Sequence, residues 1–180
     1  ELLSYQVNYT LPDPQSVDYG DLPNKDYPTL YSQNGARHVI TQTLFMGNVM
    51  PDGELDGQPT TPADGDDANG TDDEDGFHPG GVTAIPGSTV NFPVKCANNT
   101  GSPATLYGFV DWNSDGGFLD ADETSTVSVP TGSAGVFFSL PWNVPSTAVS
   151  GTTVAVRLRL STNSGLGPIG LASDGEVEDY

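Results

Sequence analysis

The feature that most limits how this chain can fold is an excess of acidic residues gathered into clusters. Ten Asp and Glu residues lie between Asp52 and Asp75, and no Lys or Arg occurs between Arg37 and Lys95. Two carboxylates about 4 Å apart repel each other by roughly 4 kcal/mol in the dielectric near a protein surface. Several such pairs would hold the loops open, and a divalent cation would reverse the sign. The clusters therefore predict bound metal.

The overall charge also excludes several classes of partner. Five Lys and Arg residues stand against 24 Asp and Glu residues, which gives a net charge of −19. Such a field repels nucleic-acid phosphates and anionic membrane surfaces. No apolar run approaches the roughly 18 residues needed to cross a bilayer. We therefore expect neither nucleic-acid binding nor membrane insertion. The single Cys96 excludes an intrachain disulfide, so bound ions would have to stabilise the loops instead.

The pattern of apolar residues predicts an all-β fold, an antiparallel β-sandwich with a long calcium-bound loop region. Residues 3–11 alternate between apolar and polar types, which predicts an N-terminal strand within residues 1–17. Residues 81–180 carry short apolar runs separated by turn residues, which is typical of a sandwich. In the last run Leu158 and Leu160 alternate with Arg157 and Arg159, which predicts one core face and one solvent face. The predicted strands are 82–85, 89–95, 104–112, 125–129, 135–140 and 153–160.

Residues 18–80, between these two regions, are dominated by Pro, Gly, Asp and Asn. One apolar stretch, Val39 to Val49, could be a strand or a short helix. Scattered aromatic side chains, such as Tyr27 and Phe77, would hold the segment against the rest of the molecule. We expect ordered acidic calcium-binding loops that cover a sheet, within a single domain spanning residues 1–180.

The sharpest local motif is DWNSDGGF at 111–118. Its spacing is that of an oxygen-coordinated calcium loop, with Gly116 making the sharp turn at position 6. Position 12 is Asp122 where a helical calcium-binding hand has Glu, and Glu123 stands one residue later. This departure favours a calcium loop within a β-fold, and a solvated turn is the alternative. The expected ligands are Asp111, Asn113, Asp115, the carbonyl of Gly117, and Glu123.

The segment ADGDDANGTDDEDG at 63–76 offers carboxylate and amide oxygens without His or Cys. Such donors suit a hard ion, so calcium is favoured over zinc or copper. A solvated acidic linker is the alternative. The expected ligands here are Asp64, Asp66, Asp67, Asp72, Asp73, Glu74 and Asp75.

Several motifs in order along the chain resemble the bacterial GEVED-type domain. They are DYGDLP at 18–23, GARHVI at 35–40, PDGELDGQPT at 51–60, DDANGTDDEDG at 66–76, FVDWNSDGGF at 109–118 and the final SDGEVEDY. In length and build the chain resembles the calcium-dependent peptide-binding domain of RTX adhesins. This resemblance implies a module that holds free C-terminal peptide ends on another cell, with several calcium ions ordering the site. It implies further calcium ligands, namely Asp18, Asp21, Asp174, Glu176, Glu178 and Asp179, and no motif identifies a peptide-binding residue.

Three functions remain open: a ligand-binding adhesion module, a calcium-rigidified structural spacer, and a lectin-like module. In the first, the ligand carboxylate would meet calcium, backbone N–H groups, Arg37 or Lys95. We expect no enzymatic activity, because His38 and His78 lie in no zinc-protease or GxSxG motif. We expect a monomeric module within a larger chain, located outside the cell on a bacterial surface.

Overall fold

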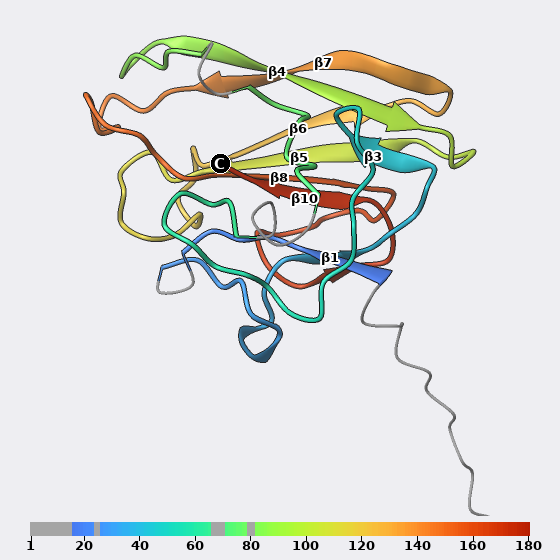
Figure 1. The fold of residues 1–180 in the computed structure, drawn as a ribbon. Coiled ribbons are helices and arrows are strands. Elements are labelled where there is room, and N and C mark those ends of the chain that lie inside the picture. The colour runs from blue at the N-terminus through green and yellow to red at the C-terminus, as the bar shows by residue number, and fades with distance from the viewer. Residues whose placement is uncertain (1–15, 24–25, 66–70, 79–81) are drawn as a thin grey trace, which may run out of the picture.

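The computed structural model describes residues 16–23, 26–65, 71–78 and 82–180, which form an all-β fold with sheets packed as in a sandwich (Figure 1). The strand predicted at residues 3–11 lies outside this described part. The sheet orders are β10-β8-β5-β6, β3-β4-β7 and β1-β2-β9. Every pairing is antiparallel except β2 with β9. The elements are β1 (Val17–Tyr19), the 3-10 turn η2 (Tyr31–Gln33), β2 (Arg37–Val39), β3 (Leu44–Met46), β4 (Thr89–Asn98), β5 (Ala104–Val110), β6 (Thr124–Val129), β7 (Ser133–Asn143), β8 (Val156–Ser161), β9 (Leu171–Ala172) and β10 (Glu176–Asp179).

The main core lies between the β3-β4-β7 sheet and the central β10-β8-β5-β6 sheet, which Figure 1 shows as adjacent layers. Burying each aliphatic side chain there contributes about 1.5–3 kcal/mol. The two layers approach closely at Gly108, where an added Cβ would lie 2.4 Å from Leu140 Cδ2. The fully buried members include Leu106 and Val110 on β5, Leu158 and Leu160 on β8, Val94 on β4 and Leu140 on β7.

The opposite face of the central sheet is also buried, and the prediction of a solvent face for Arg157 and Arg159 is wrong. Both arginines are 0% exposed. Arg157 Nη1 donates to the carbonyls of Pro28 (3.2 Å) and Pro168 (2.9 Å), so two covering loops close over it. The alternation placed the arginines correctly opposite the leucines. It could not show that the irregular N-terminal segment covers the face they occupy.

The predicted strands at 89–95, 104–112, 125–129, 135–140 and 153–160 correspond to β4, β5, β6, β7 and β8. The run at 82–85 forms no strand, and its residues instead border the main core. The apolar stretch from Val39 to Val49 contains β3, so it is a strand and not a helix. Four short strands, β1, β2, β9 and β10, were not predicted.

Candidate functional site

The loop that follows β5 folds around the carboxylate of Asp111. This buried side chain accepts hydrogen bonds from the backbone N–H groups of Asp115 (3.2 Å) and Gly116 (2.9 Å). The hydroxyl of Tyr27 donates a third bond of 2.6 Å to it. Gly116 has a φ of +87°, a left-handed conformation that glycine adopts at little cost. The sharp turn expected at position 6 of the motif is therefore present.

Glu123 turns towards this loop, whereas Asp122 is exposed. Glu123 is 2% exposed, and its carboxylate accepts the backbone N–H groups of Trp112 (3.2 Å) and Asp120 (3.1 Å). Burial raises the pKa of Glu123, and the nearby carboxylate of Asp111 raises it further. A cation bound at this loop would offset both effects.

The outer part of the same loop is polar and more accessible. Asn113 Nδ2 donates to Asp115 Oδ2 (3.2 Å) and Asp120 Oδ2 (2.9 Å). Gly117 is half-buried beside them. A hollow of about 230 Å³ opens at this place, with Asn113, Asp120 and Glu123 among its lining residues. The loop therefore gathers carboxylate and amide oxygens around one small depression, and these are the donors that calcium prefers.

Glu176 and Glu178 on β10 are buried glutamates that share the core face of the sheet with their register partners Leu160 and Leu158. Each is 1% exposed. Glu176 Oε2 accepts the N–H of Met46, and Oε1 has no hydrogen-bond partner among the described residues. Burial raises the pKa of Glu176, and the Glu178 carboxylate raises it further. No ion pair within the described part of the chain compensates either charge.

Glu178 joins two further segments to β10. Its Oε1 accepts the N–H of Gly76 (2.9 Å), and its Oε2 accepts the hydroxyl of Tyr180 (2.9 Å). Burial raises the pKa of Glu178, since the ionised form is poorly solvated there. The last turn of the middle acidic segment is therefore held directly by the C-terminal strand.

Asp179 has a different environment, because Arg157 compensates its charge. Arg157 Nε and Nη2 each donate to one Asp179 oxygen at 2.7 Å, and both side chains are 0% exposed. Asp179 Oδ2 also accepts the N–H groups of Asp21 (2.8 Å) and Leu22 (2.9 Å). Asp18 Oδ2 in turn accepts the N–H of Val177 (2.7 Å). These contacts fasten the strand β1 and the residues after it to β10.

The middle cluster is spread along the covering loops, and Asp66 and Asp67 lie outside the described residues. Asp73 is buried and accepts the N–H of Asp52, and Asp75 accepts two bonds from Asn48. Asp64 bonds to Thr60. Asp72 is exposed and Glu74 is half-buried. The predicted C-terminal ligand Asp174 accepts Thr162 N at 2.9 Å, and Asp21 Oδ2 accepts Gly65 N at 2.6 Å.

Within the described ranges, no three His, Cys, Asp or Glu side chains converge as a set that could hold one metal ion. The donor chemistry nevertheless fits calcium at two places, the Asp111 loop and the buried Glu176. The first gathers carboxylate and amide oxygens, and the second carries a buried oxygen without a hydrogen-bond donor among the described residues. The calcium assignments therefore stay predictions.

The two buried arginines, one of them bonded to His38, are the part of this region that the sequence reasoning missed. His38 Nε2 accepts a bond from Arg159 Nε (3.0 Å), and its Nδ1 bonds to the carbonyl of Asp174 (2.7 Å). Burial lowers the pKa of His38, and the charge of Arg159 lowers it further. Arg159 also donates to the carbonyls of Gly167 and Ile169. The signal available in the sequence was the alternation of two arginines with apolar residues.

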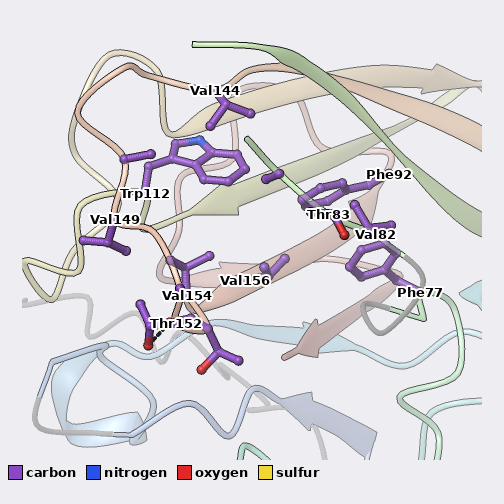
Figure 2. Close-up of a pocket in the computed structure, with 14 residues that line it drawn as sticks. Phe77, Val82, Thr83, Phe92, Trp112, Val144, Val149, Thr152, Val154 and Val156 are labelled. Atoms are coloured by element: carbon purple, nitrogen blue, oxygen red, sulfur yellow. Dashed lines mark hydrogen bonds between the residues drawn. The ribbon is translucent and has the colours of Figure 1, made fainter. Parts of the chain in front are cut away.

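An apolar cavity of about 520 Å³ lies between the two large sheets at one end of the sandwich (Figure 2). Trp112, Phe92, Val144, Val154 and Val156 are among the side chains that line it. None of its 14 lining residues carries an ionisable group. The cavity therefore offers apolar contacts and no acid or base.

Comparison with known proteins identifies the C-terminal part of the chain. No match was found among curated proteins or among solved structures. No helix in the described part is long and apolar enough to cross a membrane. The model of the GEVED domain matches residues 105–180, from β5 to the last residue. The matched region includes the sequence GEVED at 175–179, of which Glu176–Asp179 forms β10. Residues 105–180 are therefore similar to the GEVED domain.

Proposed function

We propose that this chain is a calcium-dependent ligand-binding module of a bacterial surface adhesin, and that its ligand is the free C-terminal end of a peptide on a partner cell. The observation that carries the proposal is the burial of Glu176 and Glu178 on β10, where no cationic side chain among the described residues forms an ion pair with either. A fold that buries ionisable carboxylates without a counter-ion is stabilised by any cation that binds beside them.

The residues of the chain would contribute to ion binding in two places. At β10, Glu176 and Glu178 would be ligands, with Asp18 and Asp73 close enough to raise the pKa of Glu176. Calcium would supply positive charge and take oxygen ligands there. The backbone N–H groups of Met46 and Gly76 already hold these carboxylates, so β3 and the residue after Asp75 are fixed to the same strand. An ion bound at these two glutamates would therefore order the covering loops.

At the second place, the loop after β5, the oxygens of Asp111, Asn113, Asp115 and Glu123 and the carbonyl of Gly117 would be the ligands. Tyr27, which comes from the covering segment, donates to Asp111. Ion binding at this loop would therefore also act on the N-terminal segment through one hydrogen bond.

A binding role fits a GEVED domain covered by long irregular loops, because such loops on a rigid sheet commonly carry recognition. We propose an extracellular location on the bacterial surface and no enzymatic activity. Binding of sugars that persists in chelator would support neither the calcium-dependent peptide-binding module nor the structural spacer.

The first test measures thermal unfolding of the whole chain in chelator, in millimolar magnesium and in millimolar calcium. We expect calcium to raise the melting temperature, with at least about 2.7 kcal/mol of stabilisation at 100 times the dissociation constant. Magnesium, which prefers smaller octahedral sites, should act weakly. The double variant Glu176→Gln, Glu178→Gln should lose part of the calcium response. An identical melting curve in chelator and calcium would refute the calcium premise.

The second test presents peptides with randomised last residues, in free-acid and amidated forms, and a glycan array, each with calcium and with chelator. Free-acid peptides should bind in the presence of calcium and should not bind in chelator. Equal binding of both peptide forms would reject recognition of the C-terminal carboxylate. Binding to glycans only would favour the lectin-like alternative, and no binding to any probe would favour the structural spacer.

A further inference from the structure

Among the few basic residues of this acidic chain, Arg37 has an unusual position. Arg157 and Arg159 are 0% exposed and bonded within the protein, whereas Arg37 is half-buried on β2. In the small sheet, Tyr19, Arg37 and Leu171 are direct register partners across β1, β2 and β9. Direct partners in neighbouring strands point to the same face of a sheet. These three side chains therefore lie in one row.

Arg37 and Leu171 lie on the outer face of the small sheet, whereas Tyr19, at the other end of the row, is buried. The alternate residues, Asp18, His38 and Ala172, are buried and bonded or packed towards the central sheet. Leu171, in contrast, is 44% exposed. The side chain of Arg37 thus belongs to a surface that remains accessible beside β9.

Neutral groups hold the guanidinium of Arg37 in place. Its Nη1 donates to Asn34 Oδ1 (3.2 Å) and to the carbonyl of Gly35 (2.9 Å). Its central carbon lies 4.9 Å from the centroid of the Tyr31 ring, in a cation–π contact. Within the described part of the chain, Nε and Nη2 donate no hydrogen bond and no carboxylate forms an ion pair with Arg37. The edge formed by Nε and Nη2 has the geometry for two parallel bonds to one carboxylate.

The surroundings of this edge combine the charge with apolar surface. Tyr31 is 56% exposed, Leu171 is 44% exposed and Ile169, two residues before Leu171, is 41% exposed. Asp56 stands nearby, since its Oδ1 accepts the N–H of Tyr31 at 2.6 Å. A fixed negative charge beside a cation disfavours a dianion more than a monoanion. The local chemistry therefore fits a single carboxylate that carries an apolar substituent, and fits phosphate or sulfate poorly.

We propose that Arg37, Tyr31, Ile169 and Leu171 form the subsite for the last residue of the peptide ligand. Arg37 pairs with the terminal carboxylate, and the apolar side chain of that residue lies against Tyr31 and Leu171. This inference rests on the proposed function, which it deepens by assigning the carboxylate to Arg37 and not to Lys95 or to a bound ion. The required partner is a peptide with a free C-terminus and an aliphatic or aromatic last residue.

The test follows N-acetyl-leucine and N-acetyl-leucinamide by NMR titration of the ¹⁵N-labelled whole chain in calcium. The acid should shift the Arg37 Nε–H signal and the backbone signals of Tyr31 and Leu171, and the amide should not. Arg37→Gln should weaken binding of the acid at least about tenfold. The matched control is Lys95→Gln, which removes the same charge from another sheet and should change the affinity little.

A second variant keeps the test informative if Arg37→Gln fails to fold. Leu171→Glu places a competing carboxylate beside Arg37 at an exposed position, so it should abolish binding while the melting temperature stays near that of the parent chain. Equal shifts by acid and amide, shifts that follow Lys95, or no shift at all would overturn the subsite. Repeating the titration in chelator separates the two proposals. Binding at Arg37 that persists without calcium would support the subsite and refute calcium dependence. A chain that calcium stabilises, but that shows no binding at Arg37, would support calcium dependence and refute the subsite.

Discussion

Neighbouring acids on β10 should respond in opposite ways to the same chemical change. Asp179→Asn and Glu178→Gln each replace a buried carboxylate by its amide. Arg157 compensates Asp179 through two bonds of 2.7 Å, whereas no ion pair compensates Glu178 within the described part of the chain. We expect Asp179→Asn to lower the free energy of unfolding in chelator, and Glu178→Gln to leave it unchanged or raise it.

The expected loss of stability in Asp179→Asn follows from the buried arginine that the change leaves without a counter-ion. Arg157 would remain 0% exposed without a counter-ion, and an unpaired buried charge of this kind costs about 3–5 kcal/mol. An amide oxygen can still accept the N–H groups of Asp21 and Leu22, so those two bonds need not add to the loss. The expected effect is a large fraction of the stability of an ordinary domain.

Glu178→Gln keeps its hydrogen bonds and removes the cost of a poorly solvated charge. The amide oxygen can accept the N–H of Gly76, and the amide nitrogen can donate to the Tyr180 hydroxyl. Burial raises the folded-state pKa of Glu178, so the folded parent binds a proton that the unfolded chain has lost. Stability of the parent should therefore fall as the pH rises from about 4.3 towards that raised pKa. The advantage of the Gln variant should grow over the same interval.

Urea unfolding in chelator at several pH values measures both effects. The fluorescence of Trp112 and Trp142, each 3% exposed, reports loss of the main core. Glu178→Gln that destabilises the chain as much as Asp179→Asn would show that the charge of Glu178 is compensated in the metal-free protein. A neutral Asp179→Asn would refute the account of the buried ion pair. Either result contradicts the reasoning from burial and pairing.

Three further substitutions test the fold and the loop after β5. Gly108→Ala should cost about 1–3 kcal/mol in urea unfolding, because its Cβ would meet the opposing sheet at 2.4 Å; Gly167→Ala, with no atom within 4 Å of the added Cβ, is the control. Asn98→Ala should cost about 1–3 kcal/mol, since it removes the donor to two backbone carbonyls, and amide exchange should rise at the adjoining strand ends. Tyr27→Phe, which removes the bond to Asp111, should weaken calcium binding in calorimetry, and an unchanged affinity would separate the covering segment from that loop.

The sequence predicted the parts of the fold that depend on local periodicity. The strands β4 to β8 are six to eleven residues long, and their alternation or spacing was visible. The strand β10 was hidden because three of its four residues are acidic, and acids are uncommon in strands. They occupy strand positions because Arg157 and backbone N–H groups from distant segments donate hydrogen bonds to their carboxylates. Such partners cannot be read from neighbouring residues.

The candidate site was also predicted only in part, since its local turn was predicted and its long-range contacts were not. The spacing of DWNSDGGF predicted a turn around Asp111, since a calcium-type loop is a local structure. The contact from Tyr27 joins residues 84 positions apart, and the burial of Arg157 depends on loops that themselves have no periodicity. Composition indicated that residues 18–80 cover a sheet. It could not indicate which face they cover or which carboxylates they bury.

The number of acidic residues is a poor guide to how much this fold needs cations, because many of these carboxylates already have a local use. Irregular loops leave backbone N–H groups without sheet partners, and carboxylates such as Asp52, Asp73 and Asp75 accept bonds from them. Each such bond stabilises the ionised form and offsets part of the repulsion. The need for a cation is therefore concentrated where burial exceeds hydrogen bonding. In the described structure that condition is met at Glu176, whose Oε1 is buried without a donor. The search for calcium dependence should begin at this oxygen and not at the most acidic stretch of sequence.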